Sequence, residues 1–132
     1  MADLLFVGEK PSRTAYERGW TWESGRLAAA TLFDALGVAG IDARACRFTN
    51  LFGDHPEAAE RLQGYADNRL RDLRRQAEKG VHIIALGKKV ERMLSDHCVP
   101  HIALRHPAAR GAGRGRAIYA AHVVEKLGVF GV

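Results

Sequence analysis

Long apolar runs are missing from this sequence, and no stretch approaches the roughly 20 consecutive apolar residues that a membrane-spanning helix needs. The amino terminus has a short apolar run preceded by an acid, Asp3, instead of the basic residues of a secretory signal. We therefore expect a cytoplasmic protein with no membrane contact.

Cysteine is also scarce. The chain has two, Cys46 and Cys98, and they lack the CxxC spacing that is typical of zinc and iron–sulfur sites. We predict no metal site and no cofactor. Two unpaired thiols fit a reducing compartment.

The composition is that of an ordinary globular domain, with 47% hydrophobic and 27% charged residues in a chain of 132. A chain of this size can bury about two thirds of its unfolded surface, so we predict a single domain over residues 1–132. The net charge of +5 favours a polyanionic partner such as nucleic acid, although many basic domains bind none.

Strands and helices alternate along the predicted chain. Short apolar runs predict strands at residues 4–7, 44–49, 81–86 and 99–104. Helical spacing of apolar residues predicts helices at 24–36, from His55 to a stop at Gly80, at 88–94 and at 117–127. This order favours a mainly parallel, four-stranded sheet with helices on both faces, which is a three-layer α/β/α architecture.

Three of the predicted strands end in polar or glycine-containing loops, at residues 8–11, 49–50 and 105–107. Ligands of such sheets bind beyond the carboxyl ends of the strands. We therefore predict that the functional site lies where these loops converge.

Glu9 and His106 are the candidate catalytic residues of these loops. Glu9 follows a buried strand and a glycine, so its carboxylate lies at the mouth of the predicted sheet. Pro107 favours an extended backbone at His106, which keeps the imidazole at the strand end. Simpler interpretations are a loop carboxylate paired with a nearby cation and a surface histidine.

Asn50 and two tryptophans are candidate binding residues. The amide of Asn50 offers a donor and an acceptor to the edge of a base, or it forms a local turn. Trp20 and Trp22 lie in a polar stretch, where they either pack over the following helix or form a stacking platform for a base.

Four arginines follow the last predicted strand among glycine and alanine residues. Small residues let the backbone approach a phosphate chain, and guanidinium groups match phosphate oxygens. This segment is either a clamp on a DNA backbone or a solvated loop. The arginines are Arg105, Arg110, Arg114 and Arg116.

Taken in order, these residues resemble the uracil-DNA glycosylase superfamily, especially the branch whose first motif reads GE-x-P. Residues 8–11 match that motif, and Trp22 with residues 25–27 matches the aromatic residue and glycine before an apolar helix. Three further matches are the pair at 49–50, the run at 84–87 and the HP-small motif at 106–109. The chain is a short form without the four cysteines of that branch's iron–sulfur cluster.

The resemblance implies a uracil-DNA glycosylase-like fold and hydrolysis of the N-glycosidic bond of uracil, or a related modified base, in DNA. It implies that Glu9 faces the cationic sugar and that His106 stabilises the departing base. The implied base pocket consists of Gly8, Pro11, Trp22 and Asn50.

Two other functions stay open. A non-catalytic nucleic-acid or nucleotide-binding module is favoured by the short length, whereas the retained acid and histidine favour the enzyme. A nucleotide-processing enzyme is weaker, because the glycine-rich segment 111–115 follows the wrong kind of element for a phosphate loop. We expect single- or double-stranded DNA as the partner, and a protein partner or a second copy of the chain could complete the site.

Overall fold

The computed structural model describes residues 2–54, 63–108 and 115–131, with only the backbone of residue 63. A four-stranded sheet with the order β2-β1-β3-β4 lies at its centre, and all neighbouring strands run parallel. The strands are β1 (Leu4–Gly8), β2 (Arg47–Asn50), β3 (His82–Leu86) and β4 (Ile102–Leu104). The predicted parallel sheet is therefore confirmed.

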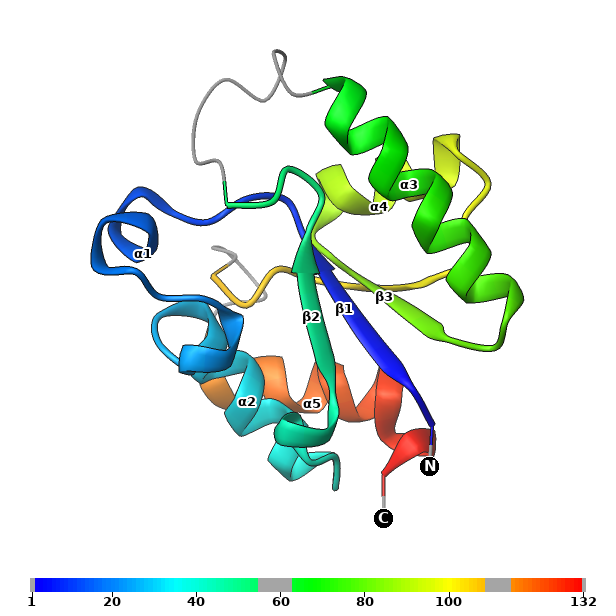
Figure 1. Cartoon of the computed structure of the whole chain (residues 1–132). Coiled ribbons are helices and arrows are strands. Elements are labelled where there is room, and N and C mark those ends of the chain that lie inside the picture. The colour runs from blue at the N-terminus through cyan, green and yellow to red at the C-terminus, as the bar shows by residue number, and fades with distance from the viewer. Residues whose placement is uncertain (1, 55–62, 109–114, 132) are drawn as a thin grey trace.

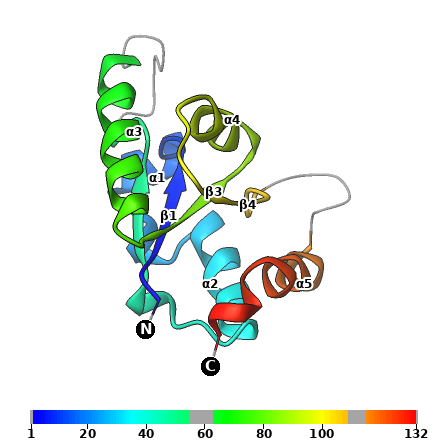
Figure 2. The same cartoon turned by 90° about the vertical axis from the view of Figure 1, so that its right-hand side faces the viewer.

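Helices cover both faces of this sheet (Figures 1 and 2). α2 (Ala28–Val38) and α5 (Arg116–Leu127) lie on one face, and α3 (Gln63–Glu78) and α4 (Lys88–Asp96) lie on the other. This arrangement confirms the three-layer α/β/α prediction. None of the helices in the described part of the chain is long and apolar enough to cross a membrane.

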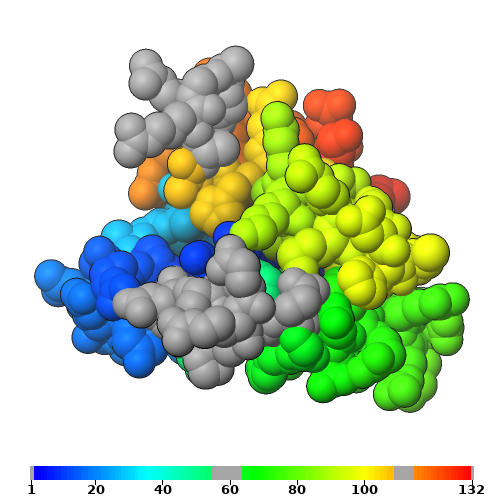
Figure 3. Space-filling model, turned by 90° about the horizontal axis from the view of Figure 1, so that it is seen from above, coloured from blue at the N-terminus to red at the C-terminus, as the bar shows by residue number. Residues whose placement is uncertain are grey.

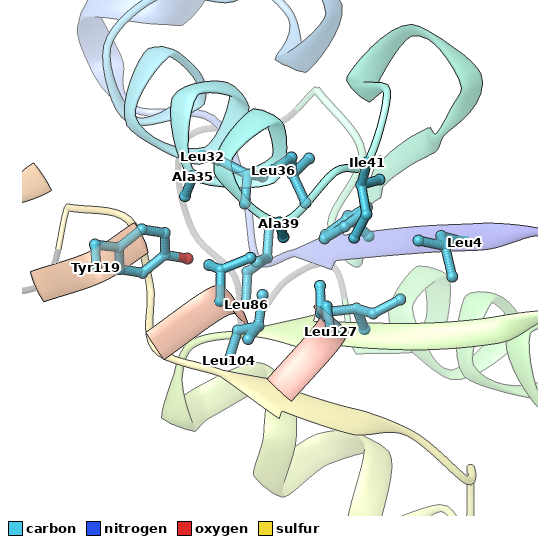
Figure 4. Packing of buried hydrophobic residues seen from close by; sticks show 13 residues of the cluster. Leu4, Leu32, Ala35, Leu36, Ala39, Ile41, Leu86, Leu104, Tyr119 and Leu127 are labelled. Atoms are coloured by element: carbon cyan, nitrogen blue, oxygen red, sulfur yellow. The ribbon is translucent and has the colours of Figure 1, made fainter. Parts of the chain in front are cut away.

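The core explains why β1 is an uninterrupted apolar run. Leu4 and Phe6 point into the cluster under α2 and α5, whereas Leu5 and Val7 point into the cluster under α3 and α4. A strand that is buried on both faces is apolar at every position, instead of alternating between apolar and polar residues. Figure 4 shows the first cluster, with side chains of α2 and α5 packed on Leu86 and Leu104 of the sheet.

The predicted helix at 24–36 has wrong boundaries. Gly25 has a φ of 67° and ends a short 3-10 helix, η1 (Trp22–Ser24), so α2 begins only at Ala28. The Ser24 hydroxyl accepts the backbone N–H of Thr21 and does not cap α2. Gly37 lies inside α2, which ends at Val38.

The strands predicted at 44–49 and 99–104 begin too early. Asp42 accepts the backbone N–H of Arg44 and caps a 3-10 helix, η2 (Ala43–Ala45), which delays β2. Cys98 has a φ of 56°, and the turn after α4 occupies the residues before β4.

Two helices differ from the predicted set or are only partly described. α1 (Arg13–Arg18) was not predicted, and its start is capped by the Ser12 hydroxyl, which accepts the N–H of Ala15. The predicted helix start at His55 lies outside the described residues, so only the later part of that helix, α3, is confirmed.

Candidate active site

The site lies at the carboxyl edge of the sheet, next to β1. The connection after β1 leads to β2 on one side, and β3 and β4 lie on the other, so the strand order reverses here. Ligands of open α/β sheets bind at such a switch point. Figure 3 shows the blue N-terminal segment beside the gold segment that precedes residue 109.

A cavity of about 720 Å³ opens at this edge. Pockets of about 300–1,000 Å³ are typical of small-molecule sites. The cavity brings five of the predicted site residues together from distant parts of the sequence. These are Glu9, Pro11, Trp22, Asn50 and His106.

Two contacts fix Glu9 at the end of β1, a backbone hydrogen bond and an ion pair of its carboxylate. Its carbonyl accepts the N–H of the buried Phe52 at 3.0 Å. Its Oε2 lies 2.6 Å from Nζ of Lys89, which is on the first turn of α4. That oxygen is buried and has no well-aligned hydrogen bond among the described residues, so the contact with Lys89 is an ion pair.

α5 fixes the loop that carries His106. The Tyr119 hydroxyl donates to the carbonyl of Arg105 at 2.8 Å, and the Arg105 N–H donates to Nε2 of His122 at 3.0 Å. Burial raises the pKa of Tyr119, which keeps its hydroxyl protonated as a donor. Burial and the neighbouring cations Arg105 and Lys126 lower the pKa of His122, which keeps its ring neutral as an acceptor.

His106 is held in one tautomer. Its Nδ1 accepts the N–H of Ala108 at 3.1 Å, so the proton of the neutral ring lies on Nε2. Burial lowers the pKa of His106, and the negative charge of Glu9 opposes this shift. Gly87 lies beside His106, since a Cβ built on it would be 3.5 Å from Cβ of His106, and its φ of 99° favours glycine.

Trp22 and Asn50 form a pair beside His106. Nε1 of Trp22 donates to Oδ1 of Asn50 at 2.9 Å. The Trp22 ring is stacked with Phe48 at 6.3 Å and lies 6.3 Å from the ring of His106. Trp22 therefore packs against the core and lines the cavity, and its stacking on a base stays a prediction.

The remaining predicted residues lie elsewhere. Gly8 is buried behind the Trp22–Asn50 pair and does not line the cavity. Arg105 is exposed, and Arg116 pairs with Asp34 of α2; neither lines the cavity. Arg110 and Arg114 lie outside the described residues.

Sequence reasoning missed several residues of the site. Lys89 lies two residues after Gly87, which follows β3, and a similar strand-end signal marks Glu9, so Lys89 could have been found. Phe48 lies on β2 among polar residues, and no local pattern in the sequence indicates that its ring stacks with Trp22. Tyr119 and His122 act through the backbone of Arg105 from α5, 14 and 17 residues further along the chain.

The donor groups do not fit an iron–sulfur cluster. Burial and the charges of Asp42 and Asp3 raise the pKa of Cys46 to about 11, so this group is a thiol that donates to the Asp42 carbonyl. Cys98 lies in another part of the chain, after α4. Within residues 2–54, 63–108 and 115–131, no cluster of three or more His, Cys, Asp or Glu residues could hold a metal ion.

The sequence was compared with models of known protein families. The model of the uracil DNA glycosylase superfamily matches residues 1–128. The chain belongs to this superfamily. No curated protein matches the chain. The match confirms the predicted superfamily and a DNA glycosylase-like scaffold, whereas the branch with the GE-x-P motif stays a prediction.

The Trp22–Asn50 pair depends on the missing side chain of Gly8. In Gly8→Ala, the new Cβ would lie 2.5 Å from Oδ1 of Asn50 and 3.0 Å from Cζ2 of Trp22, so the pair must separate. We expect a shifted indole N–H resonance of Trp22 and a loss of about 1–3 kcal/mol in the free energy of unfolding. Gly37→Ala is the control, because its Cβ meets nothing within 4 Å. An unchanged indole resonance in Gly8→Ala would contradict the role of Gly8.

The protonation of His106 gives a second prediction. Its folded pKa is depressed, so the unfolded chain takes up the proton first as the pH falls below about 6.5. The stability that the neutral ring contributes is present above that pH and is lost as the pH falls through the folded pKa. A histidine titration by NMR should give a pKa for His106 below the ordinary value.

The variant Glu9→Gln tests the cause of this shift. Removing the carboxylate should lower the pKa of His106 further, because Glu9 opposes the effect of burial. The titration of His122 should not change, because Glu9 is not among the charges that act on it. A higher pKa of His106 in the variant would contradict this assignment.

Proposed function

We propose that the protein hydrolyses the N-glycosidic bond of uracil, or of a closely related modified base, in DNA. The observation that carries this proposal is the meeting of a carboxylate, Glu9, and a neutral imidazole, His106, in one cavity. Breaking this bond develops positive charge on the sugar and negative charge on the base. A site gains rate by placing opposite groups at the two ends.

His106 suits the base end of the bond. With Nδ1 occupied by the N–H of Ala108, the neutral ring offers Nε2–H as its donor. A hydrogen bond from Nε2 to a carbonyl oxygen of the base becomes stronger as that oxygen gains negative charge. A donor that is fixed before the reaction needs no reorganisation when the base departs.

Glu9 suits the sugar end. Its carboxylate would stabilise the cationic sugar and orient the water that attacks the anomeric carbon. The water forms the new carbon–oxygen bond, and its proton passes to the carboxylate or to solvent. Lys89 would act as a positioning residue, because its ammonium group lies against one oxygen of Glu9.

Asn50 suits the recognition of a base carbonyl. An indole N–H can only donate, so the oxygen of the Asn50 amide faces Trp22 and the orientation of the amide is fixed. The NH2 group of Asn50 makes no hydrogen bond within the described part of the chain. It would donate to the O4 carbonyl of uracil, where cytosine carries an amino group.

One observation favours the alternative, a module that binds DNA without cleaving it. The ion pair with Lys89 places a positive charge 2.6 Å from the proposed catalytic carboxylate, which weakens the field that a cationic sugar would feel. The two functions differ in their products. Incubation with uracil-containing single- and double-stranded oligonucleotides, followed by alkali, breaks the strand only where a base has been released.

We expect strand breaks with the wild-type protein and a strong loss of base release in two variants. Glu9→Gln and His106→Ala should each lower the single-turnover rate by about 100-fold or more, since each removes a preorganised group. Exposed residues away from the cavity provide the controls, Glu125→Gln and His82→Ala, which should keep the wild-type rate. Circular dichroism would verify that all four variants fold.

Two results would reject these assignments. Full activity of either site variant on a substrate that the wild type cleaves would remove its catalytic role. Salt-dependent binding of uracil DNA without any strand breaks by the wild type would support the binding module in place of the enzyme.

The fixed amide of Asn50 gives a prediction about base choice. Trp22→Phe keeps an aromatic ring but removes the N–H that holds Oδ1 of Asn50, so the amide can turn. The ratio of uracil to cytosine release should fall by about tenfold, which corresponds to one hydrogen bond. Trp20→Phe is the matched control, because Trp20 lines the same cavity without a hydrogen bond to Asn50. An unchanged ratio in Trp22→Phe would contradict this role of the indole.

A further inference from the structure

We infer that Arg18, Trp20 and Arg26 form a binding site for a phosphodiester of the DNA strand, at the rim of the cavity beside α1. This group is called the arginine–tryptophan stack below. Cζ of Arg18 lies 5.3 Å from the centre of the Trp20 ring, and Cζ of Arg26 lies 5.5 Å from it. The inference rests on the proposed function only in taking DNA as the ligand.

Neither guanidinium of the stack has a carboxylate partner within the described part of the chain. Both arginines are exposed, and neither has an ion pair with another residue of the described chain. The fold thus holds two like charges at one ring, and no ion pair among the described residues offsets either of them. A phosphate group offsets these charges and matches the planar donor geometry of guanidinium.

The stack is held in place before any ligand binds. Arg18 is the last residue of α1, and the left-handed Gly19 directs the chain so that the N–H of Trp20 bonds to the carbonyl of Ala15 at 2.8 Å. Arg26 follows Gly25, which ends η1 in the same left-handed conformation. Stacking on an indole also restricts two long side chains, which lowers the entropy lost on binding.

The position of the stack fits a phosphate next to an extruded nucleotide. Trp20 and Arg26 line the same cavity as Glu9 and His106. Ala28 and Ala29 of the first turn of α2 line it too, and that turn carries no acidic side chain and no side-chain cap. The positive end of the α2 dipole therefore adds to the field of Arg26.

This site is separate from the arginines that the sequence suggested. Arg105 lies on the loop of His106, and Arg116 pairs with Asp34, whereas the stack comes from the segment between β1 and α2. The inferred phosphate-binding site for the DNA strand therefore lies at α1 and η1. The stacking of Trp20 thus serves the arginines and not a base.

The test measures binding of an oligonucleotide that contains no uracil, so it does not depend on base release. Fluorescence anisotropy of a labelled single strand at salt concentrations between about 50 and 200 mM gives the slope of log K against log salt. Each lost phosphate contact on a single strand lowers that slope by about 0.7. The double variant Arg18→Ala/Arg26→Ala should lower it by about 1.4 and weaken binding at least tenfold.

A matched double variant controls for net charge. Arg44→Ala/Arg92→Ala removes two exposed arginines that do not line the cavity, and it should keep the wild-type slope. Trp20→Leu keeps both charges but removes the stacking surface, so it should give an intermediate loss of affinity. Thermal melting of each variant separates loss of binding from loss of folding.

The outcomes separate this inference from the proposed function. Equal slopes for the wild type and Arg18→Ala/Arg26→Ala would overturn the stack as a DNA site, even if the wild type releases uracil. A reduced slope would support it, even if no base is released. Weaker binding of inorganic phosphate with an unchanged DNA slope would also overturn the assignment to the DNA backbone.

Discussion

The reversal of strand order beside β1 is the constraint on which the site depends. With β2 on one side of β1 and β3 on the other, the loops that follow these strands part and leave an opening at the carboxyl edge of the sheet. Glu9 leaves β1 at this opening, and Lys89 enters from the first turn of α4 after β3. The register of the parallel strands therefore brings the two charges together, although 79 residues lie between them in the sequence.

Core packing and site geometry are coupled through α5. Tyr119 belongs to the buried cluster between the sheet and the helices, yet its hydroxyl holds the carbonyl of the residue before His106. His122 holds the N–H of the same residue, and His106 accepts the N–H of Ala108. Both histidines are kept neutral by burial and by their role as acceptors. The packing of α5 thus determines the direction of the proposed catalytic imidazole. A substitution that loosens this packing would change the orientation of His106 even though the substituted residue contacts no ligand.

Charge is divided between the inside and the rim of the cavity. The acid, Glu9, is inside and paired, the imidazole is neutral, and the arginine–tryptophan stack is cationic at the rim. Such a division suits a reaction in which a polyanionic strand is held outside while a bond separates into a cation and an anion inside. The same rim would serve a module that only binds DNA. The difference between the two functions lies in the inner pair, Glu9 and Lys89.

The sequence by itself determined the layers, the parallel sheet and the superfamily, because strands buried on both faces must be apolar throughout and the motifs at their ends keep their order. It also identified Glu9, Asn50 and His106 as strand-end residues, and the fold brought them into one cavity. Only the tertiary structure decided the element boundaries near residues with a left-handed backbone, such as Leu27 and Cys98. It also decided the pairing of Trp22 with Asn50 and of Glu9 with Lys89. The spacing of apolar residues along a segment indicates which of its faces is buried. Contacts between distant residues depend on strand register and helix packing, which no local pattern encodes.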